Sequence, residues 1–152
     1  MKIILPGEPI SQARMRHRST GSFVLTYDPN AKEKKEVRHF LQKHATSFFK
    51  FPRISFIFEM PIPKSLPKKT IKLYQSTTVK HTKKPDIDNL IKFYLDCLDG
   101  IFFEGDQHVS LGPSYKVYSN NPQTIIVIDE TSQNLTLQET DFLFQSSAKS
   151  AK

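Results

Sequence analysis

The chain has 152 residues, of which 38% are hydrophobic and 24% charged, and its formal net charge is +7. This length predicts a single domain large enough to bury a core, and we expect neither a membrane span nor a secretion signal, because no apolar run is long enough and Pro6 and Glu8 interrupt the N-terminus. The single cysteine, Cys97, excludes an intrachain disulfide framework and a Cys-rich zinc site, and favours a buried thiol in a reducing, cytoplasmic setting.

The first elements predicted are a short strand over 2–5 and, further on, a hairpin. Phe23 to Tyr27 is rich in strand formers and pairs with the segment before it through a turn at Thr20 and Gly21. That preceding segment carries the alternating arginines Arg14, Arg16 and Arg18. In an extended chain they project from one face, where guanidinium groups can bind phosphates. A solvated edge strand is the alternative interpretation of the same pattern.

A helix is predicted to begin at Asp28–Asn30 and to run to about Phe48, with a buried stripe on one face. The stripe consists of Val37, Phe40, Leu41, His44, Ala45 and Phe48. Arg53 to Met60 follows as a strand that is apolar on both faces, which predicts a central place in the sheet. A short basic helix is expected over 68–75 with Ser65 as its cap, and a polar loop over 76–82.

The next helix, over 87–98, is predicted by apolar residues at helical spacing and by Gly100 as a stop. Its polar residues form one stripe, at Asp88, Lys92, Asp96 and Asp99. The sequence Asp86-Ile87-Asp88-Asn89 stands where the helix begins. A short carboxylate at that place can cap the helix, so capping alone is one explanation of the motif.

A second explanation is a metal site. Ile101 to Phe103 suggests a strand, and a strand returning beside the helix could bring Asp106 near Asp86 and Asp88. Three converging carboxylates repel one another and stay ionised together when a cation or a helix N-terminus compensates them. Oxygen ligands of this kind suit Mg²⁺ or Mn²⁺.

The remaining elements are strands, and we expect the chain to form an α+β or α/β domain with a mixed sheet. One strand covers 108–118 with an interruption at Gly112 and Pro113, and a final strand covers 124–128. This gives a domain over 1–130, followed by a polar tail over 131–152 that we expect to be mobile or weakly docked.

The charge is divided along the chain. Residues 1–84 contain eighteen Lys/Arg and five Asp/Glu, whereas residues 85–130 contain two Lys/Arg and eight Asp/Glu. A cationic body around an acidic centre suits a polyanionic substrate and a divalent metal, because cations hold phosphates and carboxylates hold the ion. A basic surface without any partner is the alternative.

The acidic centre resembles the RusA-type Holliday junction resolvases, endodeoxyribonucleases often encoded in prophages. The resemblance is carried by the run from Lys84 to Gly100, which reads KPDIDNLIKFYLDCLDG, and by Asp106 after it. The opening is also similar, with Gly7, Pro9, Gln12, Arg14 and Arg16 in the family's arrangement. Gly105 stands where the family usually has the first Asp of a pair, and His108 stands where Gln is common.

The resemblance implies a homodimer that binds four-way junctions and nicks two strands symmetrically with Mg²⁺, for which Mn²⁺ can substitute. It implies Asp86, Asp88 and Asp106 as metal ligands, and Lys92 as a helix lysine that binds the scissile phosphate or steadies the carboxylates. Together with the charge pattern it assigns flanking phosphates to Arg14, Arg16, Lys83 and Lys84. Three rivals stay open: a metal nuclease for other branched or single-stranded DNA, a DNA-binding protein without catalysis, and a basic structural protein.

Overall fold

The computed structural model describes residues 1–21 and 23–131, so the predicted tail, apart from Thr131, lies outside the described residues. Five strands form a mixed sheet in the order β1-β7-β4, with β5 and β6 both pairing with the far edge of β4. They are β1 (Lys2–Pro6), β4 (Pro52–Pro61), β5 (Ser110–Leu111), β6 (Tyr115–Ser119) and β7 (Gln123–Glu130). β7 is antiparallel to β1 and β4, whereas β5 and β6 are parallel to β4. The predicted fold class and the central place of the strand over 53–60 are confirmed.

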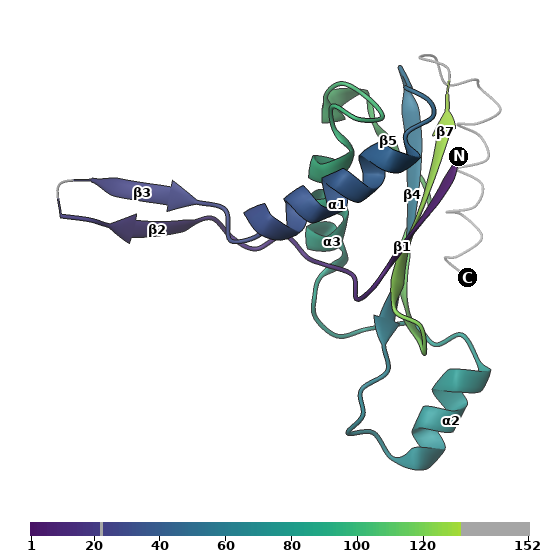
Figure 1. Cartoon of the computed structure of the whole chain (residues 1–152). Helices are drawn as coiled ribbons and strands as arrows, with labels where there is room; N and C mark the ends of the chain where they lie inside the picture. Colours follow the sequence, from purple (N-terminus) through teal and green to yellow (C-terminus); the bar gives the residue numbers. More distant parts are fainter. Residues whose placement is uncertain (22, 132–152) are drawn as a thin grey trace, which may run out of the picture.

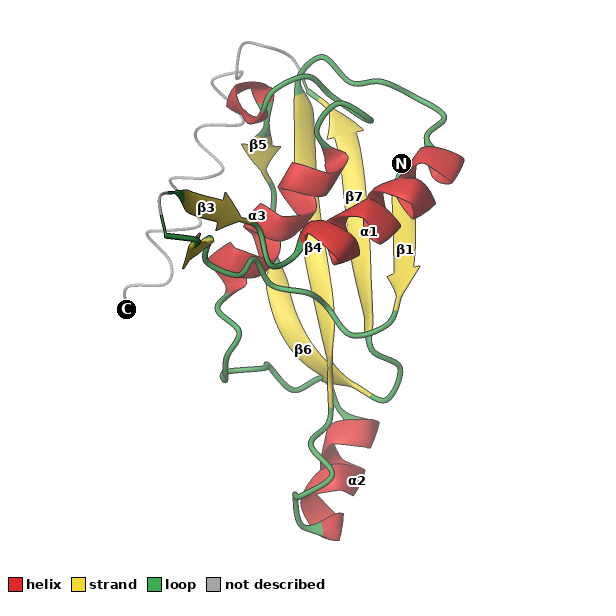
Figure 2. Ribbon diagram, turned by 60° about the vertical axis from the view of Figure 1, so that its left-hand side comes forward, coloured by secondary structure: helices red, strands yellow, loops and turns green. Residues whose placement is uncertain are grey.

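Two helices, α1 (Ala31–His44) and α3 (Ile87–Leu98), lie together over one face of this sheet (Figure 1, Figure 2). Alternate residues of β4 point toward them and are fully or nearly fully buried, namely Ile54, Phe56, Phe58 and Met60. α3 meets them with its own apolar stripe, which includes Leu90, Phe93, Tyr94, Cys97 and Leu98. None of the helices in the described part of the chain is long and apolar enough to cross a membrane.

α3 is held at its C-terminal end and at its middle by other elements, which matters because the candidate site lies at its start. Arg38 of α1 donates to the carbonyls of Asp96, Cys97 and Asp99 at 2.8 to 3.2 Å, so it satisfies acceptors that the helix end leaves free. In the middle of the helix, the Tyr94 hydroxyl accepts a bond from the Ile10 backbone N–H at 3.1 Å. The helix therefore cannot shift along the sheet without breaking these bonds.

One predicted helix boundary and one predicted helix cap are wrong. α1 ends at His44 rather than near Phe48, and the Phe48 side chain is 62% exposed rather than part of the buried stripe. The chain leaves the helix there because the Phe49 backbone N–H donates to the Phe102 carbonyl at 2.7 Å, a contact between distant segments. The short helix α2 (Lys68–Ser76) starts after Pro67, so Ser65 is not its cap.

The segment over 101–103 is a tight turn and not a strand. The backbone N–H groups of Ile101 and Phe102 both donate to the Leu98 carbonyl, and the Phe103 carbonyl accepts from Gly100 at 2.8 Å. Phe102 and Phe103 are fully buried, so the turn places both rings in the core. A 3₁₀ turn, η1 (Asp106–His108), follows.

The predicted hairpin is confirmed, but it is separate from the main sheet. β2 (Arg16–Ser19) and β3 (Val24–Tyr27) pair only with each other, as a two-stranded antiparallel sheet. The hairpin extends away from the body of the domain (Figure 1).

Candidate active site

The carboxylates of Asp86 and Asp88 lie at the start of α3. Asp86 holds the N-cap position with an extended backbone, but its side chain makes no capping hydrogen bond. Asp88 belongs to the first turn, and both residues are exposed. The capping explanation of this motif is therefore not supported for Asp86. Asp88 Oδ1 accepts a 3.5 Å bond from Asn89 Nδ2. Two exposed carboxylates thus stand at the N-terminal end of a helix, where the helix dipole is positive.

The loop before Asp86 is held by Lys116 of β6. The Lys116 Nζ atom donates to the Lys83 carbonyl at 2.9 Å and to the Pro85 carbonyl at 2.5 Å. The same stretch is tied to β6 through the backbone, because the His81 N–H donates to the Lys116 carbonyl at 3.0 Å. The edge strand thus determines where Asp86 stands.

Lys116 was not among the residues predicted from the sequence, although a signal exists. It is one of only two Lys/Arg residues between 85 and 130, and it lies inside a strand. A lone cation in such a strand has to find acceptors. Its charge also acts on a neighbour, because burial first and Lys116 second lower the pKa of His81.

Beside the two carboxylates lies a hollow of about 320 Å³ between α3 and the segment that leads into the hairpin. Its lining includes Gln12, Arg14, Asn89 and Lys92. The segment is held against α3 by a 2.9 Å hydrogen bond from the Gln12 backbone N–H to the Asn89 carbonyl. The structure therefore brings Arg14 and Lys92 to one hollow, next to the helical turn that carries Asp88.

The other predicted phosphate ligands are placed around this hollow in different ways. Lys83 and Lys84 are exposed in the loop that ends at Asp86. Arg16 is exposed in β2, further out on the hairpin. All of these cations are open to a large polyanion.

The wall of the hollow is completed by an ionic group. Lys34 Nζ lies 2.9 Å from Asp28 Oδ2 and 2.8 Å from Asp96 Oδ2. The hydrogen bond from Lys34 holds the pKa of Asp28 below its usual value. Partial burial alone would lower the pKa of Lys34, but its bonds to Asp96 and Asp28 outweigh that effect and raise it. Asp96 therefore joins α3 to α1 and to the root of the hairpin.

Asp106 is not brought to the other two carboxylates. It opens η1, and the preceding Gly105 is bonded by its N–H to Asp99 Oδ1 at 2.8 Å, directly after the end of α3. The ten residue-to-residue steps from Asp88 to Leu98 span about 15 Å of helix. Within residues 1–21 and 23–131, no group of three or more His, Cys, Asp or Glu is placed to hold a metal. The expectation that a returning strand joins Asp106 to Asp86 and Asp88 within one chain is thus not met.

The pair that remains still fits a magnesium ion. Mg²⁺ usually keeps several waters and binds through one or two carboxylates together with substrate phosphates. Asp86 and Asp88 provide such carboxylates, exposed and free of capping bonds. Gly105 has φ of 78°, in the left-handed region that favours glycine, which accounts for a glycine at this turn.

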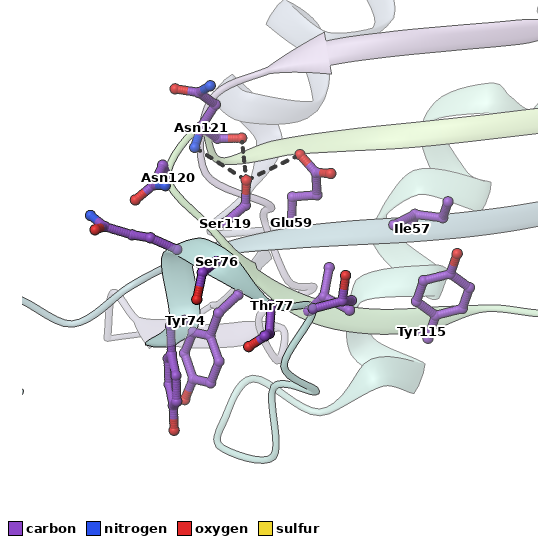
Figure 3. A pocket seen from close by; sticks show the side chains of 13 residues that line it. Ile57, Glu59, Tyr74, Ser76, Thr77, Tyr115, Ser119, Asn120 and Asn121 are labelled. Atoms are coloured by element: carbon purple, nitrogen blue, oxygen red, sulfur yellow. Dashed lines mark hydrogen bonds between the residues drawn. The ribbon is translucent and has the colours of Figure 1, made fainter. Parts of the chain in front are cut away.

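A second hollow, of about 470 Å³, lies between the end of α2 and the edge formed by β4 and β6 (Figure 3). Its one carboxylate, that of Glu59, accepts a bond from Ser119 Oγ at 3.4 Å. No lysine or arginine lines it. It offers neither paired carboxylates nor phosphate ligands, so we place the candidate active site at the start of α3.

Comparisons with known proteins identify the family of the chain. The profile of the family described as endodeoxyribonuclease RusA matches residues 6–129, which include the whole candidate site. The uncharacterized protein YqaN of Bacillus subtilis (strain 168) is 28% identical over 138 residues, which cover 87% of this chain and 97% of the relative.

Proposed function

This chain belongs to the RusA endodeoxyribonuclease family, and we propose that it is a Mg²⁺-dependent endonuclease that resolves four-way DNA junctions by paired nicks, in recombination and repair. The observation that supports this most is the start of α3, where Asp86 and Asp88 stand exposed and where the next residues of the helix, Asn89 and Lys92, line a hollow together with Arg14. Carboxylates next to cations suit a phosphodiester that binds through a metal and through its own charge.

Each residue of the site has a separate task in this proposal. Asp86 and Asp88 would hold the ion, whose chemistry would be to polarise the phosphate and to activate a water. Lys92 stabilises the charge that develops on the phosphate oxygens. Flanking phosphates are bound by Arg14, Arg16, Lys83 and Lys84, so affinity should fall steeply with salt. Mn²⁺ shares the preference for oxygen ligands and should replace Mg²⁺.

The place of Asp106 favours a homodimer. One chain keeps it about a helix length away from Asp88, but a second copy related by a two-fold axis could bring its own Asp106 to that end. Paired nicks also need two sites related by such an axis, because a four-way junction is itself close to two-fold symmetric. We therefore propose that the site is completed between two copies.

Mixing two inactive variants tests this arrangement. Asp88→Asn and Asp106→Asn damage different halves of a shared site, so a mixed dimer contains one site with both defects and one intact site. If subunits exchange freely, half of the dimers are mixed, and roughly a quarter of the sites should cut, giving single nicks. Continued inactivity of a mixture that has been shown to contain mixed dimers would place all ligands within one chain.

The activity itself is tested with a synthetic mobile four-way junction and a linear duplex, in Mg²⁺ and in EDTA. We expect paired nicks in the junction, dependent on Mg²⁺, and an uncut duplex. Asp88→Asn should bind the junction without cutting it. Cutting of both substrates would favour a less selective metal nuclease, and binding without nicks in either metal would favour a binding protein.

A further inference from the structure

The hairpin formed by β2 and β3 is unsupported by the rest of the domain. Every residue of both strands is exposed, and the strands pair only with each other. An isolated two-stranded hairpin is marginally stable in water and gains from a partner. Large apolar side chains on the hairpin are also open to solvent, namely Phe23, Val24, Leu25 and Tyr27. Such a concentration of apolar surface marks an interaction site.

The two faces of this hairpin differ in chemistry. Arg16 lies opposite Tyr27 and Arg18 opposite Leu25, so these four side chains share one face. On the other face, His17 and Thr26 are bonded to each other at 2.8 Å. One face therefore interleaves guanidinium groups with an aromatic ring and an aliphatic side chain. Phe23, directly before β3, adds a second ring that is 77% exposed, the highest value among the large hydrophobic residues described.

The charge of the hairpin selects the class of partner. Residues 14–27 contain three arginines and no Asp or Glu, so a polyanion is favoured. Proteins bind exposed bases by combining cationic side chains, which contact the nucleic-acid backbone, with aromatic rings, which stack on the base faces. A second copy of this chain carries the same net positive charge of +7 and complements the hairpin less well.

The root of the hairpin lies at the candidate active site. The Ala13 N–H donates to Asn30 Oδ1 at 2.6 Å, and the Asn30 N–H donates to Asp28 Oδ1 at 2.9 Å, so the two ends of the hairpin are joined. Asp28 in turn binds Lys34, which is also bound to Asp96 of α3. DNA held by the hairpin is thereby positioned relative to Asp86 and Asp88.

We propose that the β2–β3 hairpin is a DNA-binding arm that recognises the branch point, with Arg16 and Arg18 on phosphates and with Tyr27 and Phe23 stacked on the base faces that are exposed there. Base faces are covered by their neighbours inside a duplex and are open where strands diverge. The arm therefore distinguishes branched DNA from linear DNA. This inference rests on the proposed function and adds the element that selects the substrate.

Binding measured in EDTA, where no cutting occurs, isolates the arm from catalysis. Phe23→Ala should weaken binding to a fluorescent four-way junction by roughly tenfold and leave binding to a linear duplex nearly unchanged, since only the junction offers open bases. Phe48→Ala, which removes an exposed ring outside the hairpin, is the matched control and should have no effect. An unchanged junction affinity for Phe23→Ala would overturn the stacking role.

The arginines are tested through salt dependence. Arg16→Ala should reduce the slope of log binding affinity against log salt concentration by about 0.9, the value for one phosphate contact on duplex DNA. Lys43 is an exposed cation at the far end of α1, and Lys43→Ala should leave the slope unchanged. Sedimentation of the variants without DNA should give the wild-type mass. A change of oligomeric state on Phe23→Ala would assign the arm to a second copy and overturn the proposal.

These results separate the arm from the function beneath it. If the wild-type protein cuts junctions and both hairpin variants bind DNA as wild type does, the proposed role of the hairpin is wrong and the proposed function stands. If the wild-type protein neither binds nor cuts any branched DNA, both the proposed function and the proposed role of the hairpin are wrong.

Discussion

Replacing Lys116 with Met tests whether the edge strand positions Asp86, one of the two carboxylates of the candidate active site. The variant keeps the length of the side chain but loses the bonds to the Lys83 and Pro85 carbonyls, of which the second is partly buried. A hydrogen bond to a charged group contributes about 1.5–3 kcal/mol, and exposure at Lys83 reduces that value, so we expect a loss of about 2 kcal/mol in unfolding free energy. In a domain of this size the Tm should fall by about 8 °C.

The functional effect of Lys116→Met should appear in metal dependence. If the loop no longer holds Asp86 in place, the Mg²⁺ concentration for half-maximal junction cutting should rise, while junction binding in EDTA stays close to wild type. NMR titration gives an independent measure. The Lys116 charge is the second cause that lowers the pKa of His81, after burial, so that pKa should rise toward its ordinary value in the variant.

Lys80→Met is the matched control for this experiment. Lys80 is exposed on the strand edge next to β6 and meets Val117 through its backbone. Its removal changes the net charge by the same amount without freeing the two carbonyls. The reasoning is refuted if both variants have the same stability and the same Mg²⁺ dependence.

Three further outcomes are expected. Lys34→Met should lower the unfolding free energy by about 1–2 kcal/mol at pH 7. Because the pKa of Asp28 is lowered in the folded state, this contribution is present above pH 3.8 and is lost as the pH falls through the pKa that Asp28 has in the folded protein. The stabilities of wild type and variant, measured by urea unfolding, should therefore converge in strong acid. Asp88→Asn should retain junction affinity in a mobility-shift assay and should not cut the junction. A cutting rate equal to that of wild type would show that Asp88 is not a metal ligand. Cys97 should resist iodoacetamide at pH 8 until the chain is unfolded, since burial raises the pKa of its thiol to about 12, and rapid labelling of the folded protein would contradict this.

The sequence predicted most accurately the elements whose signals are local. α3 has the bounds that its apolar spacing indicated, because an unbroken stripe from Ile87 to Leu98 coincides with a start and a stop signal. The hairpin and the interrupted edge strand were likewise indicated by turn residues between strand formers.

The errors occurred where distant segments decide the local structure. α1 stops early because Phe49 bonds to Phe102, a partner that lies in another part of the sequence. Ile101 to Phe103 forms a turn with both phenylalanine rings buried, and an apolar run of three residues does not distinguish a strand from such a turn. Lys116 was missed for the same reason, since its acceptors are backbone carbonyls that only the fold brings near.

The most instructive error concerns Asp106. The motif predicts that three carboxylates act together, but a sequence does not state whether the three residues meet within one chain. The turn over 101–103 sends the chain to the far end of α3, so proximity to Asp88 cannot come from local geometry. The proposed homodimer offers a way to bring them together, because a two-fold axis can place Asp106 of one copy at the start of α3 in the other. The mixing experiment with Asp88→Asn and Asp106→Asn decides between this arrangement and a site that uses the ligands of one chain.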